Sequence, residues 1–382
     1  MGGGLAAQRC AESLRLRGYD QPVRIACGEA YLPYDRPPLS KELLAADARE
    51  EIASFRPESW YAEKSIEVLL SRWAEALDAP THRVSFDGGE SVDYDTLVIA
   101  TGARPRTLPI FDGYANVSTL RTLDDAHRLR GLLAGHARLV VIGAGFIGLE
   151  VAAAARAAGA EVVVIELASL PLAGLLGPEI GGWLAELHTA AGVELILGEV
   201  VTAVSGAETV ESLTLSDDRT ISCDHVLVGV GVVPDVGWLE SAGVPASGVA
   251  TDELGRSELP DVLAAGDAAA FFDPFLDRHV VSGHWEAAAR QGTIVAGTIV
   301  GAEPPPLPLS SFWSDQYGSR IQYLGHAELA DSTVIEGSLA DRDFAAEYSR
   351  DGELVAALVV GRPRAVGELR TRLSYMTERM SA

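Results

Sequence analysis

The sequence predicts an α/β fold with two units of parallel strands and helices, followed by a small C-terminal α+β domain. The clearest observation is a βαβ unit. Residues 138–143 and 161–166 are short apolar strands, and the small and apolar residues of 146–158 between them are typical of a helix packed on a sheet. The N-terminal stretch repeats this plan, with a glycine turn and helix at 2–16 and a strand at 23–27.

The remaining elements follow in order along the chain. Strands that look buried and end in glycine are expected at residues 96–102 and 225–231. Turn-rich stretches at 104–113 and 302–308 separate the units, and we expect the second to be a linker. Beyond it, the pattern predicts three strands and a final helix, at residues 321–324, 344–349, 354–360 and 365–379.

Composition excludes several classes of protein. The chain has 54 acidic and 30 basic residues, and its net charge of −24 argues against nucleic-acid binding because phosphate repels an acidic surface. Apolar runs such as 292–302 hold about ten residues, whereas a membrane span needs about twenty, so neither a span nor an export signal is expected. The three cysteines, Cys10, Cys27 and Cys223, form no CxxC pair and no disulfide framework, which fits a cytoplasmic location.

A glycine motif in the second unit predicts a dinucleotide site. Gly143, Gly145 and Gly148 follow a strand and open a helix, and Glu166 ends the next strand. In this arrangement the glycines allow a tight turn, a close approach to a pyrophosphate and close packing of the helix on the sheet. A carboxylate at Glu166 accepts hydrogen bonds from ribose hydroxyls and repels a 2′-phosphate, which favours NADH over NADPH. The alternative is a glycine-rich packing turn that binds nothing.

The N-terminal motif is similar but incomplete. Gly2, Gly4 and Ala7 fit the pattern GxGxxA, and Glu29 follows the next strand. The strand that should precede the motif is missing, because the chain begins inside the turn. One hypothesis is that Met1 stands at an internal position and that the natural protein is longer. The two motifs together predict two Rossmann-like dinucleotide-binding domains.

At this point the chain resembles a known family, the FAD-dependent, NADH-using ferredoxin reductases of oxygenase systems. The resemblance covers nearly the whole chain. Its most specific piece is the stretch Tyr34-Asp-Arg36-Pro-Pro-Leu-Ser40-Lys41. Other pieces are Ala100-Thr-Gly102, Leu120-Arg121-Thr122, the stretch GAGFIGLE at 143–150, Ala265-Gly266-Asp267 and the stretch FWSDQY at 312–317.

The resemblance implies a division of the chain and a set of binding residues. Residues 1–108 and 229–305 would form the FAD domain, 109–228 the NADH domain and 306–382 the C-terminal domain. FAD would contact Gly2, Gly4, Ala7, Glu29, Arg36, Lys41, Ala100, Thr101, Gly102, Arg121, Asp267 and Trp285, with Trp73 near the adenine. NADH would contact Gly143, Gly145, Ile147, Gly148, Glu150, Glu166 and Gly231.

Lys41 and Glu150 are the first candidates for catalytic roles. Lys41 is one of only two lysines, and it follows a rigid Pro-Pro-Leu stretch. A cation near the flavin stabilises negative charge that develops on reduction, and in the resembling family the lysine pairs with a glutamate that matches Glu150. We expect the pair to orient the nicotinamide and to stabilise the reduced flavin. The alternative is an ordinary surface ion pair, worth about 0–1 kcal/mol.

Three further residues allow two interpretations each. Trp285 and Trp313 either stack near the flavin or simply pack in a core, and Trp313 is the candidate for the electron exit route. Asp267 either accepts a hydrogen bond from a ribitol hydroxyl or caps the helix that follows.

The missing thiol pair bears on the electron acceptor. With no dithiol to relay electrons, the flavin must pass them directly to a partner, and a one-electron carrier suits it. The expected partner is a [2Fe–2S] ferredoxin that serves a cytochrome P450 or a ring hydroxylase. Reduction of rubredoxin or another small carrier is an alternative, as is a redox-sensing flavoprotein that resembles apoptosis-inducing factor. The eight histidines form no metal-binding pattern.

The C-terminal segment carries a local positive charge. Residues 361–382 contain five arginines and two glutamates, a local net charge of +3. Arg362 and Arg364 are therefore candidates for docking an acidic iron–sulfur protein. The alternative is that these arginines only stabilise a helix C-terminus and solvate a surface.

Overall fold

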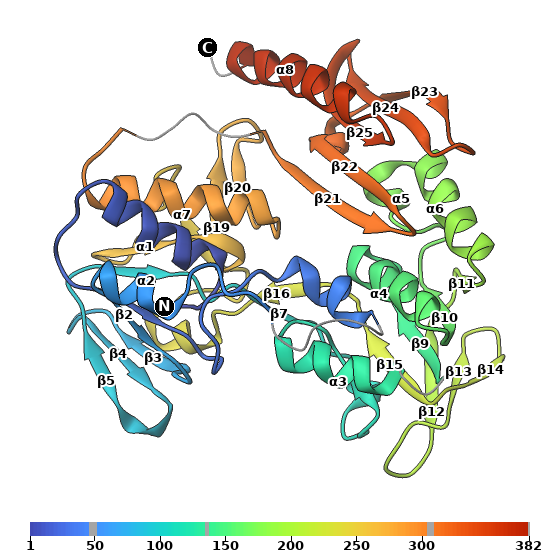
Figure 1. The fold of residues 1–382 in the computed structure, drawn as a ribbon, viewed down its shortest axis with the longest axis horizontal. Coiled ribbons are helices and arrows are strands. Elements are labelled where there is room, and N and C mark those ends of the chain that lie inside the picture. The colour runs from blue at the N-terminus through green and yellow to red at the C-terminus, as the bar shows by residue number, and fades with distance from the viewer. Residues whose placement is uncertain (46–51, 134–136, 304–308, 381–382) are drawn as a thin grey trace.

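The computed structural model describes residues 1–45, 52–133, 137–303 and 309–380, and it shows three parts (Figure 1). The middle stretch of the chain, which runs from β8 (Val117–Ser118) to β15 (His225–Val228), forms one part. The N-terminal segment and the segment that ends in α7 (Trp285–Ile299) come together as another. The C-terminal part, orange to red in Figure 1, lies against both.

The middle part is built on a five-stranded parallel sheet. Its order is β11 (Glu194–Leu197), β10 (Glu161–Glu166), β9 (Arg138–Ile142), β15 (His225–Val228) and β8 (Val117–Ser118). The helices of this part are α3 (Leu123–Leu133), α4 (Phe146–Ala157), α5 (Ala173–Leu176) and α6 (Pro178–Ala190). A small antiparallel sheet of β12 (Val201–Ser205), β13 (Ser212–Leu215) and β14 (Thr220–Ser222) is attached. The predicted βαβ unit is confirmed, because β9 and β10 are parallel neighbours joined by α4.

The N-terminal part combines segments that are distant in sequence. The helices α1 (Leu5–Leu16) and α7 pack side by side (Figure 1), while α2 (Glu58–Glu63) is short. Its parallel strand pairs include β1 (Val23–Ala26) with β2 (Ile66–Leu69), and β6 (Leu97–Ile99) with β18 (Val262–Ala264). The other strands are β3 (Ala74–Asp78), β4 (Arg83–Phe86), β5 (Ser91–Asp93), β7 (Ala103–Pro105), β16 (Val232–Pro234), β17 (Val249–Thr251), β19 (Ala269–Asp273) and β20 (Arg278–Val280).

Met1 lies between the β1–β2 pair and the β6–β18 pair. Its amino group donates a hydrogen bond to the Val98 carbonyl at 2.7 Å, and its carbonyl accepts one from the Ala100 N–H at 2.7 Å. On the other side, the Gly2 N–H donates to the Ala26 carbonyl at 2.8 Å. These bonds link β1 to β6 and place the glycine turn at the carboxyl ends of both strands.

The C-terminal part is an antiparallel sheet covered by a helix. The strand order is β21 (Ser311–Gln316), β22 (Ser319–Gly325), β25 (Glu353–Val360), β24 (Asp343–Arg350) and β23 (Ser332–Ser338). The helix α8 (Pro363–Met380) buries Leu369 and Leu373 against the sheet. The three predicted strands and the final helix are confirmed, whereas residues 304–308 of the predicted linker lie outside the described residues.

Candidate functional site

The glycine turn after β9 leaves the start of α4 open. Gly143 has φ +101°, and a Cβ there would lie 2.6 Å from the Gly229 carbonyl oxygen. A Cβ at Gly148 would lie 2.2 Å from the Gly143 oxygen, so the helix can approach the turn only because both residues lack a side chain. Gly145 caps α4 without any side-chain hydrogen bond, and the first turn holds no acidic residue. The free N–H groups there fit an anion such as a pyrophosphate.

Three further predicted residues lie around this turn. Glu166, at the end of β10, accepts hydrogen bonds from the N–H groups of Ala144 at 2.7 Å and Ala168 at 2.8 Å. Its carboxylate is thereby held beside the turn, where a ribose would follow the pyrophosphate. Ile147 is exposed on the first turn of α4, and Gly231, with φ +97°, follows β15 at the same edge of the sheet.

The N-terminal turn has the same construction. Gly2 has φ +120°, and a Cβ there would collide with the Ala100 carbonyl. Gly4 caps α1 without a side-chain bond, and no atom lies within 4 Å of the place that a Cβ would take. Ala7 is buried in the first turn of α1. This open helix start also fits a pyrophosphate.

Glu29 lies beyond β1 within a small polar cluster. Its carboxylate accepts hydrogen bonds from the Tyr34 hydroxyl at 2.5 Å and from Arg36 Nη2 at 2.7 Å. The Trp73 ring, which is 52% exposed, covers Gly28 so closely that a Cβ there would lie 2.6 Å from the indole. An exposed aromatic face beside a fixed carboxylate fits a ribose and its base.

A second cluster joins three predicted residues that are distant in sequence. Arg36 donates to the Arg121 carbonyl, and Arg121 Nη2 donates to the Asp267 carboxylate at 2.9 Å. Burial lowers the pKa of the Arg121 guanidinium, and its buried Nε has no protein partner. Because a buried polar group seldom stays unsatisfied, this nitrogen fits a hydrogen-bond acceptor from a bound group.

The neighbouring residues Ala100, Thr101 and Gly102 follow β6. Ala100 is buried, and Thr101 Oγ1 donates to the Asp235 carbonyl at 2.7 Å. A Cβ at Gly102 would lie 3.3 Å from the Arg121 guanidinium, so this backbone forms one wall of the second cluster.

Lys41 and Glu150 form a buried ion pair. Lys41 Nζ lies 2.7 Å from Glu150 Oε2, and the two side chains are 12% and 5% exposed. The Ser40 hydroxyl also donates to Oε2, and the Ser314 hydroxyl donates to Oε1 at 2.6 Å. The alternative of an exposed surface pair is therefore wrong. Removing one charge of a buried pair leaves the other desolvated and without a counter-charge, so its loss costs more than the loss of an exposed pair.

Trp285 and Trp313 lie against each other. Their ring centroids are 5.8 Å apart with an interplanar angle of 68°, and Trp285 Nε1 donates to Asp35 Oδ1 at 2.7 Å. The pKa of Asp35 is raised, and the largest cause is burial of its carboxyl group. The pair joins the start of α7 to β21, at the boundary between two parts of the molecule.

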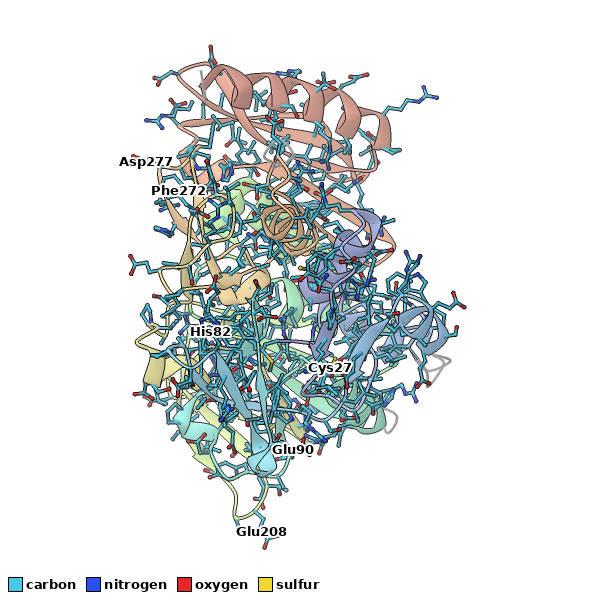
Figure 2. All side chains as sticks on the ribbon, turned by 90° about the vertical axis from the view of Figure 1, so that its left-hand side faces the viewer. Cys27, His82, Glu90, Glu208, Phe272 and Asp277 are labelled. Carbon is cyan, nitrogen blue, oxygen red and sulfur yellow. The ribbon has the colours of Figure 1, made fainter. Side chains whose placement is uncertain are left out.

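The three cysteines provide no redox pair. All are free and buried, and burial raises the pKa of Cys10 and Cys27 to about 12 and that of Cys223 to about 11. Figure 2 shows Cys27 inside the molecule, in contrast to Glu208 at an outer loop. Since the thiolate is the reactive form, burial and a raised pKa disfavour these thiols as an electron relay at neutral pH.

The C-terminal arginines differ from each other. Arg362 pairs with Asp343 and, at 3.4 Å, with Glu336, whereas Arg364 is exposed and forms no ion pair among the described residues. The local charge of +3 counted along the sequence omits these carboxylates, which β23 and β24 bring to Arg362. Of the two candidates, only Arg364 presents an uncompensated charge.

Several residues of the site were not singled out from the sequence. Ser40 and Asp35 lie in the stretch 34–41, and Ser314 lies in the stretch 312–317. The sequence motifs therefore included these residues, but they did not indicate which side chains they bond to. Within the described ranges, no group of three His, Cys, Asp or Glu residues is placed to hold a metal ion. Nor does any helix in those ranges have the length and apolar character needed to cross a membrane.

Comparisons with known proteins agree with this arrangement. Residues 1–292 match the family of pyridine nucleotide-disulphide oxidoreductases, and residues 311–380 match the reductase C-terminal family. The chain is 36% identical to the ferredoxin–NAD(+) reductase component of the anthranilate 1,2-dioxygenase system of Burkholderia cepacia, over 97% of this chain and 92% of that protein. It is 33% identical to putidaredoxin reductase of Pseudomonas putida, over 95% and 88% of the two chains.

A solved structure gives the same result. The chain aligns with one chain of the covalent putidaredoxin reductase–putidaredoxin complex with a TM-score of 0.93. The two are 32% identical, and the alignment covers 97% of this chain and 91% of the other.

Proposed function

Since the chain belongs to the pyridine nucleotide-disulphide oxidoreductase family, we propose that it passes electrons from NADH, by way of FAD, to a [2Fe–2S] ferredoxin. The ferredoxin would in turn serve a cytochrome P450 or a ring hydroxylase, in the cytoplasm. The observation that carries the proposal is a single chain with two open helix starts, at Gly4 and Gly145, and three inert thiols. Such a chain can bind two nucleotides. An electron relay through a pair of its own thiols does not fit it.

The proposal assigns each cluster to a cofactor. Residues 1–108 and 229–305 hold FAD, with the pyrophosphate at Gly2, Gly4 and Ala7 and the adenosine end at Glu29 and Trp73. Arg36, Arg121, Asp267, the backbone at 100–102, Lys41 and Trp285 face the rest of that cofactor. Residues 109–228, through Gly143, Gly145, Ile147, Gly148, Glu166 and Gly231, hold NADH. Residues 306–382 cover one side of the flavin.

FAD, when bound, accepts a hydride and releases single electrons, which is chemistry that no side chain of this protein supplies. The protein contributes electrostatics and position. The Lys41 ammonium would provide a fixed positive charge beside a bound flavin, and Glu150 holds that ammonium in place at 2.7 Å. Trp313, packed on Trp285 at the boundary of the C-terminal part, places an aromatic ring on the proposed exit route.

An absorption experiment tests the proposal. The purified protein should show a flavin spectrum that bleaches on addition of NADH and returns when an oxidised [2Fe–2S] ferredoxin is added. A colourless protein, even after incubation with FAD, would refute the proposal. Return of the spectrum with rubredoxin but not with ferredoxin would instead assign the protein to another class of carrier reductase.

A further inference from the structure

A row of buried polar side chains leads away from the Lys41–Glu150 pair. The Ser314 hydroxyl lies 2.6 Å from Glu150 Oε1, and Gln316 Nε2 lies 3.0 Å from Ser314 Oγ. Gln316 Oε1 then lies 2.8 Å from His188 Nε2, and His188 Nδ1 lies 2.9 Å from the Tyr317 hydroxyl. The row crosses from α4 through β21 to α6, so it joins the middle part of the molecule to the C-terminal part.

The middle members of the row, Ser314, Gln316 and His188, are sealed from water. Ser314 and His188 have no exposed surface, and Gln316 is 2% exposed. Each polar atom in the row must therefore find its partner inside the protein, because an unpaired buried donor or acceptor costs about 1–3 kcal/mol. For this reason the orientation of one member dictates the orientation of the next.

The carboxylate at one end sets the direction of the hydrogen bonds. Glu150, paired with Lys41, can only accept, so the Ser314 hydroxyl donates to it. Ser314 Oγ then accepts from the Gln316 amide, which leaves the Gln316 oxygen to accept from His188 Nε2. His188 must carry its proton on Nε2, and its bare Nδ1 accepts from Tyr317.

We propose that Ser314, Gln316 and His188 are positioning residues that hold the Glu150 carboxylate toward Lys41, through a chain of hydrogen bonds that all point to Glu150. The inference rests on the proposed function, because it concerns the same ion pair. Gln316 is an amide and cannot pass a proton on without changing its own bonding. The chain therefore transmits orientation and does not conduct protons.

The electrostatics of His188 agree with this arrangement. Burial lowers the pKa of His188 to about 4, so the ring is neutral at pH 7. A neutral ring has one donor and one acceptor nitrogen, which the chain requires, whereas a protonated ring would have two donors and could not accept the Tyr317 hydrogen bond.

Nitrogen NMR of ¹⁵N-histidine-labelled protein tests the direction of the chain. We expect His188 in the tautomer protonated at Nε2. Ser314→Ala, which removes the link to Glu150, should shift His188 toward a mixture of tautomers, whereas Tyr317→Phe, at the far end, should leave the tautomer unchanged. Wild-type His188 protonated at Nδ1, or a tautomer that does not respond to Ser314→Ala, would overturn the proposal.

Stopped-flow bleaching by NADH tests the effect on the ion pair. Ser314→Ala should slow the bleaching about tenfold, as expected for one lost hydrogen bond to a charged group. The matched control is Ser311→Ala, on the same strand, because Ser311 is buried and its hydroxyl has no partner. Equal rates in the two variants would contradict the proposal. If wild-type protein does not bleach, the proposed function fails, while the tautomer experiment still decides the direction of the chain.

Discussion

At the residue scale, the site depends on pairs that the chain brings together from far apart. Lys41 and Glu150 are separated by 109 positions, and Arg121 and Asp267 by 146. Lys41 stood out in the sequence because lysine is so rare, and Glu150 because it closes a motif. Burial of the pair was not predictable, since it depends on Ser40 and Ser314 closing over the carboxylate from two other segments.

Lys41→Ala should damage both catalysis and stability. Without the ammonium, Glu150 remains buried as an uncompensated carboxylate, and we expect the free energy of unfolding to fall by about 3 kcal/mol. Bleaching by NADH should also slow, which stopped-flow absorbance measures.

The control for this variant is Lys64→Ala. Lys64 is the other lysine of the chain, and it is exposed at the end of α2. Its replacement should change neither the free energy of unfolding nor the rate of bleaching by NADH. Unchanged stability and an unchanged bleaching rate in Lys41→Ala would show that the pair is dispensable.

At the scale of elements, Gly292 of α7 determines how closely this helix packs on α1. A Cβ at Gly292 would lie 2.4 Å from the Ala6 carbonyl oxygen of α1. The two backbones can therefore approach this closely only where the side chain is a hydrogen atom. Because α1 starts at the N-terminal glycine turn, the contact also positions the open helix start at Gly4.

Gly292→Ala should separate the two helices. We expect the free energy of unfolding, measured by urea denaturation, to fall by about 1–3 kcal/mol, the usual effect of overpacking. Gly182→Ala in α6 should have the opposite sign and raise stability by about 0.5–1 kcal/mol, because no atom lies within 4 Å of the place for its Cβ. A stabilising effect of Gly292→Ala would mean that the helices tolerate the extra methyl group.

At the scale of the whole molecule, buried histidines link stability to pH. His225, in the central sheet, is buried, and its Nε2 lies 2.8 Å from the Ser118 hydroxyl. Burial, with a smaller contribution from Arg128, lowers the pKa of His225 from 6.5 to about 4. Between pH 6.5 and 4 the unfolded chain therefore binds a proton that the folded protein does not, and stability falls as the pH falls.

For this histidine, the free energy of unfolding should change by about 1.4 kcal/mol per pH unit. Urea denaturation between pH 6.5 and 5 should show a smaller loss of stability in His225→Asn than in the wild type. His279→Asn, at an exposed position, should keep the wild-type slope. Identical slopes for all three proteins would show that His225 does not titrate in this way.

The charge distribution on the protein surface should also affect ferredoxin binding. Arg364 is the arginine at the start of α8 whose charge has no partner among the described residues, so Arg364→Gln should weaken ferredoxin binding about two- to fivefold at low salt. Arg362→Gln should have a smaller effect, because Asp343 and Glu336 already neutralise Arg362. Apparent affinities measured at several salt concentrations compare the two, and equal affinities for Arg364→Gln and wild type would exclude docking there.

The sequence by itself determined the βαβ unit at residues 138–166, the glycine turns, and the C-terminal strands and helix, because local patterns of apolar residues and glycines act over a few positions. It also indicated two nucleotides and the lack of a thiol relay. Only the tertiary structure decided which polar atoms meet. The Lys41–Glu150 pair, the partners of Arg362 and the row from Glu150 to Tyr317 all join separate segments of the chain. The energies of the Lys41–Glu150 pair and of the row also depend on the exclusion of water. That exclusion arises only when the three parts pack together.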